Sequence, residues 1–371
     1  MKIVFAGGGT GGHLYPAIAL ADALAGRAQM LFIGTADRLE KKIVPRAGYD
    51  LQTVWSRPLV RRISFAAITT AVVNAVGIAQ SMRILMEFRP NLIVATGGYV
   101  CFPVVVAAKM LRTLRALRVR LALLEPNARP GLTNRLLVPL VDEVWGAFAR
   151  DRTAFGGKYV HTGVPVRQSL FRANNRIEAS RRLGLDPSRR TILAIGGSQG
   201  ARSINEAIAA LVTRRALPAD WQVLHVSGER DFSYMQAEER DLFGNNAVVL
   251  VPYLNDMADA YAVCDIVIAR AGASTLGELA ALGIPAVLIP YPFASEDHQT
   301  TNARQYEAAG AAAVVADSEL NADSLWWTLR AVMEPARLAA MRDAARSLAA
   351  GDPVASILAR IDALSARKNA A

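Results

Sequence analysis

The strongest chemical signal in the sequence is a pair of glycine-rich stretches, GGGTGGH at residues 7–13 and GGSQGAR at residues 196–202. Each follows a short apolar run of β-strand character and precedes a helical pattern. Glycines allow a tight turn and bring backbone N–H groups close to a phosphate at a helix N-terminus, where the helix dipole favours an anion. The pair predicts two phosphate or diphosphate contacts, with the Ser198 hydroxyl as a further donor in the second. The alternative for the second stretch is a turn that binds no ligand.

His13 closes the first stretch and is the residue there best suited to proton transfer. A neutral imidazole accepts a proton near physiological pH, so His13 could act as a general base. It could equally cap the helix or bind phosphate, and the sequence leaves these roles open.

The first stretch is not a dinucleotide-binding fingerprint, although its glycines fit one by register. His13 and Pro16 stand where the interior of the helix should begin. The strand expected over 29–33 is followed by Gly34 and Thr35 rather than by the acidic residue that binds a ribose in nicotinamide enzymes. A dehydrogenase is therefore disfavoured.

Glu278 lies one turn inside a helix that starts with the small residues of RAGASTLGEL (270–279). A carboxylate there can accept two hydrogen bonds from a ribose cis-diol. Thr275 and Glu278 also have the spacing of a capping box, in which the glutamate reaches back to the N-cap amide. Sequence alone does not separate the two roles.

Further polar groups follow other expected strands. DHQTTNA (297–303) offers His298, Gln299 and Asn302 to sugar hydroxyls, or else is an exposed helix start capped by Asp297.

In the first half, GGYV (97–100) and EPN (125–127) should bring Gly97, Gly98 and Asn127 to the same place as His13. Arg167 could donate two hydrogen bonds to a phosphate, or could simply be a surface arginine.

These groups need an α/β framework to position them, and the apolar pattern predicts one. Strand-like runs at 2–6, 29–33, 91–96 and 120–125 alternate with helical segments, and the pattern restarts with runs at 191–195, 221–226, 265–269 and 285–290. We expect two Rossmann-like lobes with parallel sheets that face a cleft. The predicted boundaries are 1–163 for the first lobe and 164–351 for the second, with a last helix at about 352–371 that packs back on the first lobe.

Charge is distributed unevenly between the two halves. Residues 1–163 hold 21 Lys and Arg against 9 Asp and Glu, whereas the remainder holds 21 against 23. A one-sided positive field favours a polyanionic partner, and without any nucleic-acid-reading motif we expect an anionic lipid surface rather than nucleic acid.

The uncharged segment 63–82 is long enough to span a membrane. Its polar and apolar residues lie on opposite faces at helical spacing, so we predict an amphipathic helix that docks on the membrane surface through 59–89. The apolar stripe is Phe65, Ile68, Val72, Val76, Ala79 and Met82, and the arginines around it are Arg57, Arg61, Arg62, Arg83 and Arg89. The alternative is that this stripe faces the core.

The two cysteines, Cys101 and Cys264, lie in apolar runs without CxxC spacing, and the N-terminus lacks the pattern of a signal peptide. We expect a protein of the reducing cytosol with no structural disulfide and no zinc site. No DxD motif is present, and no metal or other cofactor is expected.

Taken together and in order, the motifs resemble the MurG family, the lipid-linked N-acetylglucosaminyltransferases of bacterial peptidoglycan synthesis. The stretches that carry the resemblance are GGGTGGHLYPAIALA, ATGGYV, EPNARPGLTN, TGVPVR, GGSQGAR, DMADAYAVCD, RAGASTLGEL and DHQTTNA. The resemblance implies a GT-B fold and inverting transfer of GlcNAc from UDP-GlcNAc to lipid I, which gives lipid II. It also implies a peripheral protein on the cytoplasmic face of the cell membrane, with partners among the proteins of cell-wall synthesis.

Carried over to this sequence, the resemblance implies His13 as the catalytic residue and a set of donor contacts. These contacts are Thr10, Gly11, Gly12, Asn127, Arg167, Ser198, the backbone at Leu254, Ala273, Ser274, Thr275, Leu276, Gly277, Glu278 and Gln299. Val164 and Pro126 depart from the residues common in the family and bring the local geometry beside Arg167 and Asn127 into question.

Three other functions fit parts of the pattern. A glycosyltransferase that acts on diacylglycerol would share the fold and the UDP-sugar loops. A UDP-GlcNAc epimerase would need no basic, apolar face, and a non-catalytic nucleotide-sugar sensor would need no His13.

Overall fold

The computed structural model divides the 371-residue chain into two compact units. The first comprises Met1–Arg167 and Ala350–Ala371, and the second comprises Gln168–Ala349. Residues 164–167 and 351, which are predicted from the sequence to lie in the second lobe, fall in the first unit by this division. The structure describes residues 1–59, 65–148, 155–171, 175–197, 200–214, 217–238, 248–254, 256–349 and 351–366.

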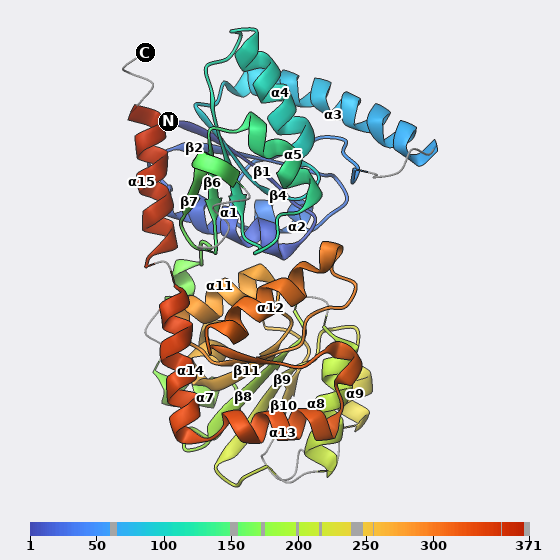
Figure 1. The fold of residues 1–371 in the computed structure, drawn as a ribbon, viewed down its shortest axis with the longest axis vertical. Helices are drawn as coiled ribbons and strands as arrows, with labels where there is room; N and C mark the ends of the chain where they lie inside the picture. The colour runs from blue at the N-terminus through green and yellow to red at the C-terminus, as the bar shows by residue number, and fades with distance from the viewer. Residues whose placement is uncertain are drawn as a thin grey trace. The chain divides into compact units, whose positions relative to one another are not determined.

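The first unit is built on a seven-stranded parallel sheet in the order β3-β2-β1-β4-β5-β6-β7 (Figure 1). Its strands are β1 Lys2–Gly7, β2 Gln29–Gly34, β3 Leu51–Thr53, β4 Leu92–Gly97, β5 Arg120–Glu125, β6 Glu143–Gly146 and β7 Tyr159–His161. Its helices are α1 Gly11–Ala23, α2 Glu40–Arg46, α3 Phe65–Phe88, α4 Cys101–Thr113, α5 Leu132–Leu137 and α15 Pro353–Ala366, with 3₁₀ turns η1 Val138–Leu140 and η3 Gly156–Lys158.

The second unit holds a six-stranded parallel sheet in the order β10-β9-β8-β11-β12-β13. Its strands are β8 Arg190–Ile195, β9 Trp221–Val226, β10 Val248–Val251, β11 Cys264–Ala269, β12 Ala286–Leu288 and β13 Ala312–Val314. Its helices are α7 Arg176–Arg182, α8 Arg202–Arg214, α9 Phe232–Glu238, α10 Ala258–Val263, α11 Ala273–Leu282, α12 His298–Ala308, α13 Ala322–Val332 and α14 Pro335–Leu348, with 3₁₀ turns η4 Gln168–Phe171, η6 Ser295–Asp297 and η7 Asp317–Glu319.

All the strand-like runs named from the sequence are strands, and the predicted α/β class with two Rossmann-like lobes of parallel sheet is confirmed. The central strands are mostly apolar and are buried along nearly their whole length, as expected for parallel strands covered on both faces, and β4 is buried at every residue. In each sheet the first strand in the chain, β1 or β8, lies inside the sheet, with neighbours on both sides. The loops after these strands therefore begin where the strand order reverses, which is where open α/β sheets bind ligands.

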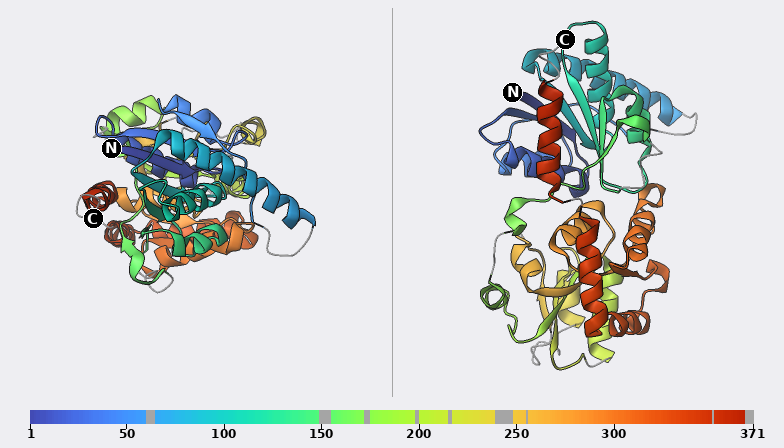
Figure 2. Two further views of the ribbon diagram at one scale, coloured as in Figure 1. Left: turned by 90° about the horizontal axis from the view of Figure 1, so that it is seen from above. Right: turned by 60° about the vertical axis from the view of Figure 1, so that its left-hand side comes forward.

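Helix α15 packs on the first unit, as the second view of Figure 2 shows. Ile357, Ile361 and Leu364 are buried in the core that also contains Trp145. Arg360 donates to the carboxylate of Glu143, whose side chain is 8% exposed. The last helix is therefore held to this unit by both apolar burial and an ion pair. The predicted segment after residue 366 lies outside the described residues.

Helix α3 packs on the first unit through its polar face. Asn74 is buried and accepts hydrogen bonds from the Arg57 amide and the Ser56 hydroxyl, both at 3.1 Å. Gly77 is equally constrained, since a Cβ there would lie 2.0 Å from the carbonyl oxygen of Trp55. The polar residues face inward because they satisfy the backbone of the segment before the helix.

The apolar face of α3 is exposed to solvent. Ile68 and Val72 are 60% and 59% exposed, and Val76 is 38% exposed. The alternative that this stripe faces the core is wrong for these three residues. Met82, which we had placed in the stripe, instead packs against the core. The side chain of Phe65 and residues Arg61 and Arg62 lie outside the described part of the chain.

Candidate active site

His13 lies in the first turn of α1, directly after the loop that follows β1. Its Nδ1 atom is 3.0 Å from the carbonyl oxygen of Thr96 at the end of β4. A carbonyl oxygen only accepts hydrogen bonds, so Nδ1 must carry the proton, and the lone pair of the neutral ring is then at Nε2. This is the tautomer that a general base acting through Nε2 requires.

The position of His13 depends on glycines in the loop after β4. A Cβ on Gly97 would lie 2.3 Å from Nδ1 of His13, and one on Gly98 would lie 2.5 Å from the carbonyl oxygen of Gly8. Both glycines also have φ values in the left-handed region, at 112° and 86°. The structure thus brings Gly97 and Gly98 to His13, as predicted.

Glu40 holds the loop between β1 and α1 through hydrogen bonds, and this role was not predicted from the sequence. Its side chain is buried and accepts hydrogen bonds from the amide of Gly9 at 3.0 Å, the amide of Thr35 at 2.9 Å and the hydroxyl of Thr35 at 2.6 Å. A Cβ on Gly8 would lie 2.4 Å from its Oε1. In the sequence Glu40 stands among the charged residues of TADRLEKK, where a surface role is the usual interpretation, and only its burial reveals its role.

The Glu40 carboxylate changes the interpretation of the first glycine-rich stretch. The Gly9 amide is already bonded to a carboxylate, so it is not a donor to phosphate. The predicted contacts at Thr10, Gly11 and Gly12 lie farther on, at the N-terminus of α1. Any anion would bind at this helix start rather than in the turn before it.

Arg167 lies close to this helix start. Its guanidinium carbon is 4.8 Å from the centre of the Tyr15 ring, and a Cβ on Gly11 would lie 3.0 Å from that ring. Its Nε atom is buried without a hydrogen-bond partner among the described residues. A buried, unpaired guanidinium N–H is unfavourable unless an acceptor binds there, so Arg167 has the properties of a phosphate ligand.

Asn127 is held by another buried acid. Glu125, at the end of β5, accepts from the backbone amide of Asn127 at 3.0 Å and from its side-chain amide at 3.1 Å. It also accepts from Asn134 at 2.7 Å. Asn127 is therefore fixed at the carboxyl-terminal edge of the first sheet, as are His13 and Gly97.

In the second unit, Glu278 is oriented by a tyrosine rather than by a helix cap. The hydroxyl of Tyr261 donates to its Oε2 at 2.7 Å. Helix α11 begins at Ala273 with Gly272 as the N-cap, so Thr275 is inside the helix and the capping-box alternative is wrong. The other predicted contacts Ser274, Leu276 and Gly277 lie in the same helix, whose N-terminus follows β11.

Gln299 and Asn302 have different roles on α12. The Gln299 Oε1 accepts from the Tyr291 amide at 3.0 Å, which leaves its Nε2 group directed to no partner among the described residues. Asn302 is fully buried and donates to the carbonyl oxygen of Ala271 at 3.3 Å, so it holds the start of α11 instead of binding a sugar. Leu254 is half-buried after β10, and Ser198 lies outside the described residues.

Arg270 is a second residue that the sequence reasoning missed. It donates to the carbonyl oxygens of Ile289 and Pro290, to the Ser203 hydroxyl and to Asp317. It thereby fixes the loop that leads to Tyr291 and Gln299. The only sequence feature that could have pointed to Arg270 is its position directly after a predicted strand.

Among the described residues, no group of three or more His, Cys, Asp and Glu side chains could hold a metal ion. Cys101 and Cys264 are both buried, and burial raises the pKa of each thiol to about 12. Cys101 donates to the carbonyl oxygen of Ala6 at 3.1 Å, so it serves the packing of β1 rather than chemistry.

Comparison with known proteins assigns this arrangement to a family. Residues 3–145 match the N-terminal domain of glycosyltransferase family 28, and residues 191–360 match its C-terminal domain. A relative in Caldanaerobacter subterraneus is 38% identical over 360 residues, which are 95% of this chain and 96% of the relative. It is named UDP-N-acetylglucosamine–N-acetylmuramyl-(pentapeptide) pyrophosphoryl-undecaprenol N-acetylglucosamine transferase, the MurG enzyme. The chain belongs to the MurG family.

Two further similarities agree with this assignment. A relative of the same name in Moorella thermoacetica is 40% identical over 358 residues, covering 94% of this chain and 95% of the relative. The crystal structure of MurG from Acinetobacter baumannii superposes with a TM-score of 0.77 at 26% identity, covering 97% of this chain and 99% of that one. The expected GT-B fold of the MurG family is thereby confirmed.

Replacing Glu40 by Gln should loosen the loop of this MurG family member that carries His13. The amide nitrogen of glutamine cannot accept a hydrogen bond, so one of the bonds to Gly9 or Thr35 is lost, at about 1 kcal/mol. Hydrogen exchange across residues 7–13, followed by mass spectrometry, should become several-fold faster. Glu87→Gln on the exposed surface of α3 is the matched control, and equal exchange in the two variants would contradict the role given to Glu40.

Proposed function

We propose that this chain transfers N-acetylglucosamine from UDP-N-acetylglucosamine to lipid I, undecaprenyl-diphospho-N-acetylmuramoyl-pentapeptide, and so forms lipid II and UDP. Membership of the MurG family and the names of the two relatives support this choice of substrates. The observation that carries the catalytic part is the hydrogen bond from His13 to Thr96, because it sets the tautomer of the base.

The proposed reaction inverts the anomeric carbon in a single displacement. The muramoyl 4-hydroxyl oxygen bonds to that carbon while the bond to the β-phosphate oxygen breaks. His13 takes the hydroxyl proton at Nε2, and UDP leaves with the bonding electrons. The Nδ1–H bond to Thr96 keeps the ring in place and stabilises the imidazolium that forms.

Charge that develops on the departing UDP needs donors that are already in position. In this proposal Arg167 supplies one of them, since its buried Nε lacks a partner. The amides of Gly11 and Gly12 at the start of α1, and those at the start of α11, supply others. Ser198 and the backbone at Leu254 complete the phosphate and base contacts by family resemblance.

In this proposal Glu278 binds the ribose of UDP and Gln299 binds the GlcNAc ring. Glu278 has one carboxylate oxygen hydrogen-bonded to Tyr261 and would accept from the ribose hydroxyls. Gln299 would donate from Nε2 to a hydroxyl of the GlcNAc ring, with Asn127 as a second amide. Both amides are already oriented by their own hydrogen bonds.

The direct test is incubation of the purified chain with UDP-GlcNAc and lipid I, with lipid II and UDP measured together. Diacylglycerol in place of lipid I tests the alternative lipid acceptor, and omission of acceptor tests hydrolysis or epimerisation of the donor. UDP release that occurs only with lipid I, in equal amount to lipid II, is expected. UDP release with diacylglycerol alone would refute the proposal.

His13→Ala should lower kcat about 100-fold or more, as expected for loss of a general base. The Kd for UDP-GlcNAc, measured by calorimetry, should change little. If donor binding collapses while kcat at saturating donor is retained, His13 is a phosphate ligand and the proton goes elsewhere.

Glu278→Gln should weaken UDP binding by about tenfold, the equivalent of one charged hydrogen bond. The melting temperature should stay nearly constant, because glutamine can still accept from Tyr261 and no helix cap is lost. Calorimetry with UDP and with 2′,3′-dideoxy-UDP, which lacks both ribose hydroxyls, separates the ribose contact from a general loss of affinity. Unchanged affinity for UDP would remove Glu278 from the site.

The chain is also proposed to dock on the cytoplasmic face of the membrane through α3. Its length and composition from Ala67 to Phe88 would allow it to cross a bilayer. The buried polar contacts of Asn74 and Gly77 argue for a surface contact instead, because a spanning helix would have to break them. Ile68, Val72 and Val76 are then free to enter the headgroup boundary, and Arg57, Arg83 and Arg89, all exposed, can contact anionic lipid at about 1 kcal/mol each.

The double variant Ile68→Asn/Val72→Asn should reduce co-sedimentation with phosphatidylglycerol vesicles several-fold, and Arg83→Glu/Arg89→Glu should make the residual binding insensitive to salt. Ile177→Asn, at a 48%-exposed isoleucine of the second unit, is the matched control. If both double variants bind vesicles as the wild type does, α3 is not the docking surface. That result would leave the catalytic proposal unaffected.

A further inference from the structure

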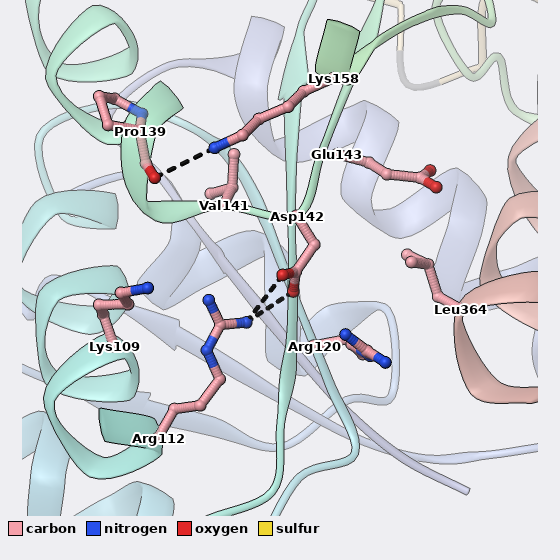
Figure 3. Close-up of a pocket in the computed structure, with 9 residues that line it drawn as sticks. All are labelled: Lys109, Arg112, Arg120, Pro139, Val141, Asp142, Glu143, Lys158 and Leu364. Carbon is pink, nitrogen blue, oxygen red and sulfur yellow. Dashed lines mark hydrogen bonds and ion pairs between the residues drawn. The ribbon is translucent and has the colours of Figure 1, made fainter. Parts of the chain in front are cut away.

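A basic pocket of about 400 Å³ lies on the first unit, away from the candidate active site. Figure 3 shows the residues that line it: Lys109, Arg112, Arg120, Pro139, Val141, Asp142, Glu143, Lys158 and Leu364. Arg120 and Glu143 are the first residues of β5 and β6, and Lys158 directly precedes β7. The pocket is therefore at the amino-terminal edge of the sheet, whereas His13 follows the carboxyl-terminal edge.

Both carboxylates of the pocket already have cationic partners. Asp142 accepts from Arg112 at 2.9 and 2.7 Å and from the Leu121 amide at 2.8 Å. Glu143 is paired with Arg360 of α15 and also accepts from the indole N–H of Trp145. Asp142 and Glu143 are thus paired with Arg112 and Arg360, and not with the other cations of the pocket.

Within the described part of the chain, three cations of the pocket have no carboxylate partner. Lys158 there donates to the carbonyl oxygens of Val138 and Pro139, each at 3.1 Å. The charged groups of Lys109 and Arg120 make no hydrogen bond or ion pair with the described residues. All three side chains are partly buried, and partial desolvation of like charges in one pocket is unfavourable unless an anion joins them.

We propose that this pocket binds a phosphate group, as a free phosphate or as the phosphodiester of a lipid headgroup. A phosphate has enough oxygens to accept from all three cations, and the planar guanidinium of Arg120 can bind two of them at once. The proposal is independent of the transferase reaction, because no residue of this pocket is in the candidate active site.

The probe for the first experiment is inorganic phosphate, added to the full chain in the presence of saturating UDP, which fills the proposed donor site. Melting temperature and calorimetric heat are compared with chloride at equal ionic strength. Phosphate should bind and raise the melting temperature, and the double variant Lys109→Gln/Arg120→Gln should lose at least tenfold in affinity. Lys41→Gln/Arg46→Gln removes the same charge from exposed positions of α2 and should bind as the wild type does.

A second experiment distinguishes the two sources of phosphate. Co-sedimentation with phosphatidylglycerol vesicles is measured for the same variants, with and without inorganic phosphate as a competitor. Competition, together with weaker vesicle binding by Lys109→Gln/Arg120→Gln, identifies a lipid headgroup; loss of phosphate binding with unchanged vesicle binding identifies a free phosphate. The proposal would be overturned if phosphate and chloride had the same effect on the wild-type chain in both melting and calorimetry. It would also be overturned if Lys109→Gln/Arg120→Gln and Lys41→Gln/Arg46→Gln bound phosphate equally well. The wild-type comparison holds even if a variant fails to fold.

Discussion

The hydrogen bond between Nδ1 of His13 and the carbonyl oxygen of Thr96 connects the fold of the first unit to its chemistry. It forms because β1 and β4 are neighbours in the sheet, although they are far apart in the chain. The loops after these two strands therefore meet, and Gly97 lets the imidazole lie against the backbone. If the strand order or Gly97 were changed, the ring could keep neither its position nor its tautomer.

Buried and partly buried polar side chains hold these loops through hydrogen bonds to the backbone. Glu40 holds the turn before α1, and Glu125 fixes Asn127 after β5. In the second unit Arg270 and Asn302 do the same for the loops around β11 and β12. Each of these side chains satisfies backbone groups that would otherwise be buried without partners, so the cost of burying it is offset by the hydrogen bonds that it makes. The residues proposed to contact substrate are then held in fixed positions although they lie on loops.

Periodicity predicted most of the fold, because the long central strands are mostly apolar runs that are separated by regular helical segments. The short strands β3, β6, β7, β10 and β13 were not predicted, since three or four residues give too little pattern. The glycine-rich stretches indicated the positions of His13, Gly97 and Gly98. Positions that need a left-handed φ or a close approach of two backbone segments favour glycine, and glycine is visible in the sequence.

The errors have a common cause. Glu40 and Arg270 look like surface charges in the sequence, and Asn302 looks like an exposed polar residue, yet all three make buried or partly buried contacts with distant backbone. On α3 the predicted outward direction of the apolar stripe is confirmed for Ile68, Val72 and Val76, and among the described residues only Met82 was misplaced, because it packs against the core. Thr275 had the spacing of a cap, but the helix starts before it. Local spacing does not report which long-range partner a polar side chain will find.

The most direct measurement of the catalytic claim is the protonation pattern of the His13 ring. The chain has four histidines, so ¹⁵N-labelled histidine gives few signals, and comparison with His13→Gln assigns those of His13. Above the pH at which the ring becomes neutral, the account predicts a protonated Nδ1 and an unprotonated Nε2 for this residue. A neutral ring with its proton on Nε2 would contradict the bond to Thr96 and remove His13 as the base.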